Sequence, residues 1–177
     1  MIKYIQQFIY SYGIYKHSGF LFNLFNLIIV HITGYNHDKY WSRRLYVLDA
    51  SKKNIIKKLY YIYYLKKVDA KHLSFSGFSL NGGSQFVTPP LLPHGFNRII
   101  VGHDAKIGAN VVFYQGVTIS HGGCIIGDNV TLGANCVILP NVCIGNNAKI
   151  GANCVVVEDI PDGATCVLNK PRIIIKK

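Results

Sequence analysis

Three histidines are the side chains of the C-terminal half that are best suited to proton transfer. His94 lies in the segment LPHGFNRIIVG, His103 in VGHDAK and His121 in TISHGG. Histidine changes its charge nearest to neutral pH, so it can serve as a general base or acid. Few other titratable groups lie nearby, because residues 73–177 hold only seven Lys and Arg and five Asp and Glu. The elements around these histidines therefore decide which of them could act on a substrate.

A six-residue repeat runs through residues 101–155 and surrounds these histidines. Its hexads read VGHDAK, IGANVV, FYQGVT, IGDNVT, LGANCV, ILPNVC, IGNNAK and IGANCV. A period of six is neither helical nor a strand alternation, so it indicates a repeat architecture. Three hexads fit one triangular coil of a parallel β-helix, in which residues about eighteen apart stack at the strand spacing of roughly 4.8 Å. A sandwich of ordinary strands would not produce so many consecutive hexads.

Each hexad position has a predicted place in such a coil. Position one is aliphatic or Phe and should line the interior. Position five should lie inside a corner, since it is always small or β-branched: Ala105, Val111, Val117, Val130, Cys136, Val142, Ala148 and Cys154. The turns need positive φ, which Gly adopts freely and Asn tolerates well. We expect Asn110, Asn129, Asn135, Asn141, Asn147 and Asn153 to supply it.

The five cysteines indicate a reducing compartment and a structural role. All lie from Cys124 onward, and Cys136 and Cys154 both occupy position five, eighteen residues apart. No C-x-x-C spacing suggests a metal site or a reactive thiol. We expect these thiols to fill the core.

The hexad register slips once, by one residue, and His121 lies at that slip. A slip in a strict repeat usually marks a loop pushed out of the coil, and loops on rigid scaffolds carry function. His94 lies where the regular hexads begin. We therefore expect catalytic roles for His94 and His121, while His103 should face solvent in a turn. The alternative for each is a turn histidine without a task.

The chain divides into a helical N-terminal region, residues 1–73, and a β-helix domain, residues 74–177. The apolar run at residues 20–33 is too short to span a bilayer, and we find no convincing secretory signal. We expect a cytoplasmic protein, with peripheral contact at the inner membrane face as an alternative. Residues 74–93 should form irregular first coils, with Pro89 and Pro90 at a corner.

The positive charge belongs to the N-terminal region. The chain carries +11, of which residues 1–72 contribute +9, and lysine pairs at residues 52–53, 57–58 and 66–67 alternate with a Tyr-rich face. One interpretation is that these lysines are the solvated side of a helix that packs by its aromatic side. Alternatively they attract anionic lipid headgroups or a lipid-linked substrate. Nucleic-acid binding is disfavoured, because no recognised motif accompanies the charge.

Together the hexads, PHGFNRIIVG and the closing EDIPDGATCVLNKPRIII resemble the hexapeptide-repeat acyltransferases over about residues 75–175. The nearest branch is that of serine O-acetyltransferases and the O-acetyltransferases of surface polysaccharide synthesis. This resemblance implies a left-handed parallel β-helix, a homotrimer, and acetyl-CoA as co-substrate in a cleft between neighbouring coils. It implies no metal.

Site residues follow from the resemblance by position. His94 matches the family's catalytic histidine, a general base that takes the proton from an acceptor hydroxyl. His121 falls where a second active-site histidine lies beside an intersubunit cleft. Ala134 and Ala152 match positions whose backbone groups bind the pantetheine arm. Lys170 and Arg172 fall near a tail that offers positive charge to CoA phosphates.

Departures from the family pattern bear on the acceptor. Pro93 stands where serine acetyltransferases have Asp, and no acid occurs between Lys71 and His103. The loop that normally carries an Arg for the carboxylate of serine is reduced to residues 120–123 (SHGG), and the usual G-N-P-A ending is altered to residues 168–171 (LNKP).

These departures favour a sugar hydroxyl as acceptor, in the biosynthesis of a surface polysaccharide (capsule, exopolysaccharide or lipopolysaccharide). Serine O-acetylation for cysteine biosynthesis is the alternative. A non-catalytic β-helix scaffold or binding protein is a hypothesis of another class. A three-histidine zinc site of the carbonic-anhydrase kind is disfavoured, because the histidines lack its spacing.

Overall fold

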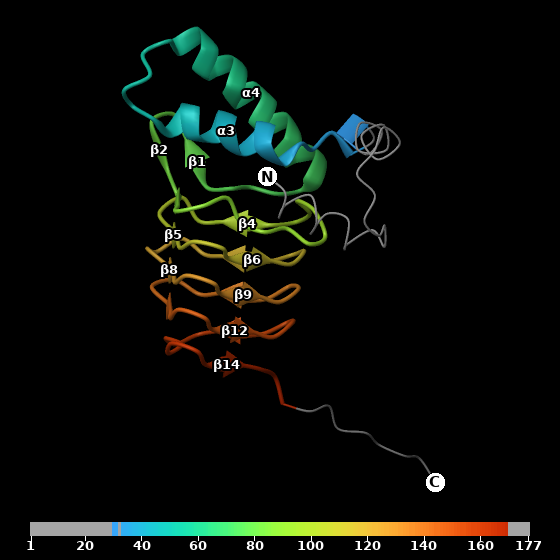
Figure 1. Ribbon diagram of the computed structural model, residues 1–177, viewed down its shortest axis with the longest axis vertical. Coiled ribbons are helices and arrows are strands. Elements are labelled where there is room, and N and C mark those ends of the chain that lie inside the picture. Colours follow the sequence, from blue (N-terminus) through green and yellow to red (C-terminus); the bar gives the residue numbers. More distant parts are fainter. Residues whose placement is uncertain (1–29, 32, 170–177) are drawn as a thin grey trace.

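Two-residue strands form the sides of a stack of triangular coils (Figure 1). The computed structural model describes residues 30–31 and 33–169. The strands of the coils are β3 (Gln85–Phe86), β4 (Ile100–Val101), β5 (Lys106–Ile107), β6 (Val112–Phe113), β7 (Thr118–Ile119), β8 (Ile125–Ile126), β9 (Thr131–Leu132), β10 (Val137–Ile138), β11 (Cys143–Ile144), β12 (Lys149–Ile150), β13 (Val155–Val156) and β14 (Thr165–Cys166).

Each strand pairs in parallel with the same side of the next coil, which gives three four-stranded sheets. Their strand orders are β13-β10-β7-β4, β11-β8-β5-β3 and β14-β12-β9-β6. The register pairs Val101 with Ile119, Ile119 with Ile138, and Ile138 with Val156. The middle step is one residue longer than its neighbours, so the slip is absorbed without loss of pairing. The predicted left-handed parallel β-helix is confirmed.

The hexad positions lie where the sequence predicts. The position-one residues from Val101 to Val156 are buried and form interior ladders, and every position-five residue from Ala105 to Cys154 is buried with them. All six predicted asparagines have positive φ, between 55° and 64°. Two of the side-chain amides also stack, because Asn110 Nδ2 donates to Asn129 Oδ1 and Asn129 Nδ2 donates to Asn147 Oδ1. The repeat therefore fixes both the core and the turns.

Three corners join the sheets, and we name each after one residue. The His94 corner comprises residues 92–98, 114–116, 133–135 and 151–153. The His121 corner comprises residues 102–104, 120–124 and 139–141. The Asp128 corner comprises residues 108–110, 127–129, 145–147 and 161–163.

Residues 74–93 form the first coil, as predicted. Phe75 bridges to Ile100, β3 pairs with β5, and Leu91 bridges to Val112. Pro89 and Pro90 lie between β3 and Leu91, where the chain turns from one sheet to the next. An antiparallel hairpin of β1 (Phe78–Ser79) and β2 (Gly82–Gly83) projects from this coil toward the helices.

Helices α3 (His37–Leu48) and α4 (Ile55–His72) cover the first coil (Figure 1). Asn36 and Asn54 cap them, each accepting a hydrogen bond from a backbone N–H three residues on. A loop separates the two helices, and the lysine pair at residues 52–53 lies in that loop.

Much of the positive charge of this region is used inside the molecule. Arg44 is fully buried and donates to Ser76 O at 2.9 Å and to Ser84 Oγ at 2.7 Å. The Arg43 guanidinium lies 4.1 Å from the Tyr64 ring centroid, and Lys66 Nζ lies 4.5 Å from that of Phe75. The predicted solvated lysine face with its aromatic side packed inward is therefore only partly found, because Lys58 is buried while Tyr60 and Tyr63 of α4 are exposed. Within the described residues, no helix is both long and apolar enough to cross a membrane.

Candidate active site

Two side chains of the following coil hold the ring of His94. Its Nδ1 lies 2.6 Å from Oε1 of Gln115, and its ring meets that of Tyr114 edge-on at a centroid distance of 5.3 Å. The loop itself is anchored, because the Gly116 N–H donates to Asn97 O, and the buried Phe96 ring stacks on Tyr35. His94 is therefore an exposed imidazole on a fixed support.

The Gln115 contact defines the tautomer of neutral His94. An amide oxygen can only accept, so Nδ1 must carry the proton and donate it. The lone pair then lies on Nε2, which has no hydrogen-bond partner among the described residues. A neutral imidazole with a free Nε2 is the form that a general base requires. Gln115 thus takes the orienting role for which the sequence offered no upstream acid.

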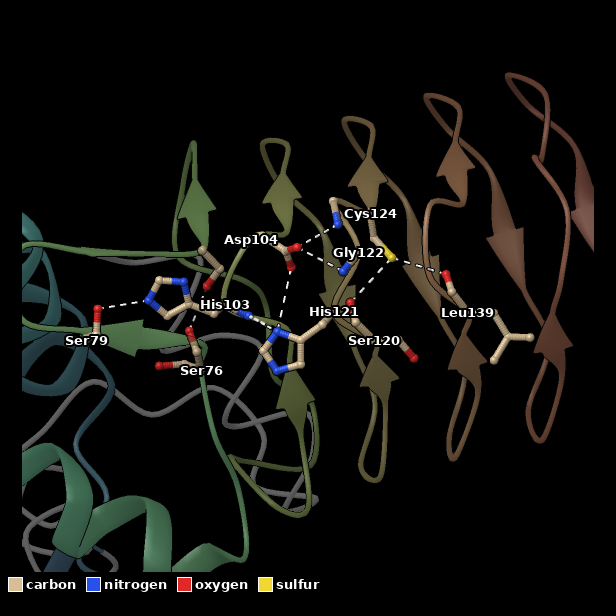
Figure 2. Close-up of polar contacts among 11 residues, drawn as sticks. Ser76, Ser79, His103, Asp104, Ser120, His121, Gly122, Cys124 and Leu139 are labelled. Atoms are coloured by element: carbon tan, nitrogen blue, oxygen red, sulfur yellow. Dashed lines mark hydrogen bonds and ion pairs between the residues drawn. The ribbon is translucent and has the colours of Figure 1, made fainter.

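His121 has the opposite arrangement at its own corner (Figure 2). Its Nδ1 accepts the backbone N–H of His103 at 3.2 Å, so the proton of the neutral ring lies on Nε2. The Asp104 carboxylate lies 3.8 Å from the same Nδ1, beyond hydrogen-bond distance. In the neutral form, His121 therefore carries a proton on Nε2 that it can donate, whereas Nε2 of His94 carries a lone pair that can accept a proton.

His94 and His121 do not meet within one chain. They occupy different corners of the triangle, separated by the sheet that contains β7. His103 lies on the His121 corner, where its Nε2 is 2.8 Å from Ser79 Oγ of the β1–β2 hairpin (Figure 2). The ring of His103 is thus engaged by the hairpin rather than simply facing solvent.

Ala134 and Ala152 lie on the same corner as His94, one and two coils beyond Gln115. Both side chains reach the surface: Ala134 is half-buried and Ala152 is exposed. Their coils are joined by the Asn135 N–H donating to Gln115 O and the Asn153 N–H donating to Ala134 O. The two predicted pantetheine positions and the candidate base therefore form one column.

That column lacks a feature of the Asp128 corner. There the side-chain oxygen of each third hexad residue accepts the backbone N–H of the third residue in the preceding coil. Asp128 accepts the N–H of Ala109, Asn146 that of Asp128, and Asp162 that of Asn146, at 2.7 to 2.8 Å. Alanine has no such oxygen. The amides of Gln115 and Ala134 do not receive this bond, so they are available to an extended ligand that carries carbonyl groups.

The other candidate groups are placed as follows. Lys170 and Arg172 lie outside the described residues. Among the described residues, no group of three or more His, Cys, Asp or Glu side chains is arranged to hold a metal ion. Burial raises the pKa of the Cys136 thiol to about 12, which fits a core filler rather than a nucleophile.

Two residues with clear roles in this geometry were missed from the sequence. Gln115 contacts His94 across 21 residues, and Asp104 contacts the slip through Gly122 and Gly123 (Figure 2). A signal for Gln115 was present: it occupies the third hexad position, directly beneath His94, where a side chain can reach the preceding coil.

Comparisons with known proteins agree with this geometry. Residues 123–157 match the family described as bacterial transferase hexapeptide (six repeats). A serine acetyltransferase of Staphylococcus xylosus is 36% identical over 110 residues, which are 58% of this chain and 50% of that protein. This chain therefore spans about half the length of that curated relative.

Solved structures point the same way. A serine acetyltransferase isoform 3 of Entamoeba histolytica in complex with cysteine has a TM-score of 0.63 and 21% identity, covering 99% of this chain and 60% of that one. A serine acetyltransferase in complex with CoA has a TM-score of 0.56 and 25% identity, covering 72% and 50%.

The predicted polysaccharide acceptor is wrong, since these relatives are serine acetyltransferases. The reasoning relied on a missing Arg in one loop and on a basic N-terminal region, yet Arg43, Arg44 and Lys66 are engaged by aromatic rings and backbone carbonyls of the chain itself. The broader prediction is confirmed. The hexads, the left-handed coil and the match of residues 123–157 all show that the chain is similar to the hexapeptide-repeat transferases, as the sequence resemblance predicts.

Proposed function

We propose that this chain is an acetyl-CoA-dependent serine O-acetyltransferase, with the activity residing in residues 74–177. The observation that carries the proposal is the 2.6 Å contact of His94 Nδ1 with Gln115 Oε1, which leaves Nε2 of an exposed imidazole without a partner, in a chain similar to serine acetyltransferases. The structure in complex with CoA shares this fold and supports the same donor. A non-catalytic scaffold would have no need for an oriented, exposed imidazole.

The chemistry follows from the two histidines. Nε2 of His94 takes the proton from the hydroxyl of serine as that oxygen attacks the thioester carbonyl of acetyl-CoA. The C–S bond then breaks, and the proton on Nε2 passes to the departing thiolate of CoA. O-acetylserine and CoA leave, and neutral His94 is restored. His121, with its proton on Nε2, would donate to the carboxylate of serine.

A homotrimer would allow His94 and His121 to act in the same site. His94 and His121 lie on different corners of one triangular coil, so a site that contains both needs a second copy of the chain. A three-fold arrangement would place the His94 corner of one copy against the His121 corner of the next. Such a head-to-tail contact closes into a ring of three copies with three equivalent sites.

Acetyl-CoA would lie along the His94 corner. The pantetheine arm carries two amide groups, which complement the backbone N–H groups of Gln115 and Ala134, because Ala134 and Ala152 have no side-chain oxygen to accept them. Lys170 and Arg172 would offer positive charge to the phosphates at the far end.

The test is CoA release from acetyl-CoA by the purified protein, followed with a thiol reagent. L-Serine is compared with ethanolamine, which keeps the hydroxyl and amine but lacks the carboxylate, and with L-alanine, which lacks the hydroxyl. We expect turnover with L-serine, weak turnover with ethanolamine and none with L-alanine. Equal rates with and without L-serine would contradict the proposal. A clean monomer by light scattering that still turns over would contradict the shared site.

A further inference from the structure

The loop at the hexad slip contains two consecutive residues of unusual backbone conformation. Gly122 has φ of 109° and Gly123 has φ of 74°, values that side-chain-bearing residues rarely adopt. Gly122 is also tightly enclosed, since an added Cβ would lie 2.7 Å from Cβ of Pro140 in the next coil. A glycine pair has large conformational freedom, so other groups must hold this loop in one shape.

Asp104 of the preceding coil holds the loop from one side. Its Oδ2 accepts the N–H groups of both Gly122 and Gly123, each at 2.9 Å (Figure 2). The hydrogen bond from the Gly122 amide is the main cause that lowers the pKa of Asp104, so the carboxylate is ionised at neutral pH. On the other side, Asn141 N–H donates to Gly122 O at 3.0 Å.

This clamp coincides with the contact that defines the tautomer of His121. The His103 N–H reaches Nδ1 of His121 only while residues 120–123 keep the imidazole beneath the preceding coil. His103 and Asp104 are adjacent, so one short segment supplies both the clamp on the glycines and the hydrogen bond to the ring. We propose that Asp104 is a positioning residue, which holds the slip loop so that His121 presents an Nε2–H donor to the acceptor.

This inference rests on the proposed function for its role in catalysis, although its structural part does not. The loop of residues 120–123 (SHGG) has no cation of its own and places its histidine next to two glycines with positive φ. A carboxylate that fixes two backbone amides at once gives a short loop the rigidity that orientation of a donor requires.

The experiment compares three variants of the full chain. Asp104→Ala removes the clamp, and Asp104→Asn keeps an acceptor oxygen for the two amides. Asp128→Ala is the matched control, because Asp128 is also exposed and also accepts a backbone N–H of the preceding coil, at 2.7 Å from Ala109, but on a corner without a histidine. Thermal unfolding of each variant establishes that it is folded.

Two readouts are used. Long-range proton–nitrogen NMR on histidine-labelled protein reports which nitrogen of His121 carries the proton, with His121→Asn identifying its signal. Steady-state kinetics separate KM for L-serine from kcat. For Asp104→Ala we expect a mixture of His121 tautomers and a KM for L-serine raised about tenfold, with KM for acetyl-CoA unchanged. Asp104→Asn should restore most of both properties, and Asp128→Ala should alter neither.

Unchanged His121 signals and an unchanged KM for L-serine in Asp104→Ala would overturn the proposal, as would equal changes in Asp128→Ala. If the wild-type protein does not acetylate serine, the proposed function fails and the NMR readout alone decides. A tautomer mixture specific to Asp104→Ala then supports the positioning role, and a wild-type spectrum overturns it.

Discussion

The His94 corner and the Asp128 corner are built from the same hexad but differ at its third position. On the Asp128 corner that position holds Asp or Asn in three successive coils, and each side chain accepts a backbone N–H of the coil before. On the His94 corner it holds Gln115, Ala134 and Ala152. Gln115 reaches back to an imidazole instead of an amide, and the alanines reach nothing.

This difference shows how a repeat can carry function without losing its fold. We call a corner closed where the third-position side chains accept the backbone N–H groups of the preceding coil, because those N–H groups are then not available to a ligand, and open where they do not. Where that ladder is interrupted, amides become available while the sheets on both sides continue to pair. The His121 corner is intermediate, since an imidazole takes the ladder position and accepts from the His103 N–H. We therefore expect function in this coil at the corners where the ladder is modified.

Removing His94, the proposed base of the open His94 corner, should have the largest effect on activity. We expect His94→Ala to lower kcat/KM for L-serine by at least about 100-fold, the usual size of a general-base effect, with binding of CoA retained. Thiol release measures the rate, and calorimetric titration with CoA measures the binding. Asp128→Ala is the control, because Asp128 lies on the corner whose residues include no histidine. Near-normal turnover in His94→Ala would mean that acetyl transfer does not take place at the His94 corner.

Substitution of Gln115, which contacts His94, should have the next largest effect on activity. Gln115→Leu removes the acceptor for Nδ1–H of His94, and we expect kcat to fall by about tenfold, since neither tautomer nor ring orientation is then fixed. Gln115→Glu keeps the acceptor and adds a negative charge, which favours the protonated imidazole. The acid limb of its kcat/KM profile should therefore move to higher pH. An identical profile in wild type and Gln115→Glu would argue against the contact.

The repeat was predictable from the sequence because its constraints are local. A position-one aliphatic, a position-five small residue and an Asn with positive φ each follow from what one hexad needs, and all lie as expected. The histidines could be selected because one precedes the first regular hexad and the other marks the slip. Their assigned roles remain predictions until the variants above are measured.

Contacts between coils were not predictable in the same way. Gln115 and Asp104 act on residues 21 and 18 positions away, through side-chain rotamers that the hexad pattern does not specify. The charge of the N-terminal region was misleading for a related reason. Counting treats every cation as solvated, whereas Arg44 is buried against Ser76 and Ser84. A sum of charges cannot show which of them a neighbouring ring or carbonyl already satisfies.

A substitution that restores a side-chain acceptor on the His94 corner should have a smaller effect, confined to KM for acetyl-CoA. In Ala152→Asn the new side chain can accept the N–H of Ala134, as Asn146 accepts that of Asp128 eighteen residues earlier. We expect KM for acetyl-CoA to rise about tenfold, because the amide is no longer available. KM for L-serine should stay at the wild-type value, and the unfolding midpoint should be no lower than that of the wild type. Unchanged KM for acetyl-CoA would exclude the Ala134 amide from donor binding.

The reciprocal change should have the smallest effect. Asn146→Ala opens the Asp128 corner by removing the acceptor for the Asp128 N–H, and the net loss of one such bond is about 1 kcal/mol of unfolding free energy. Urea denaturation measures that loss, and both KM values should stay at wild type, because no base or second histidine lies on this corner. If Asn146→Ala instead raised KM for acetyl-CoA as much as Ala152→Asn, the two corners would not differ in function, and donor binding would depend on the stability of the whole coil.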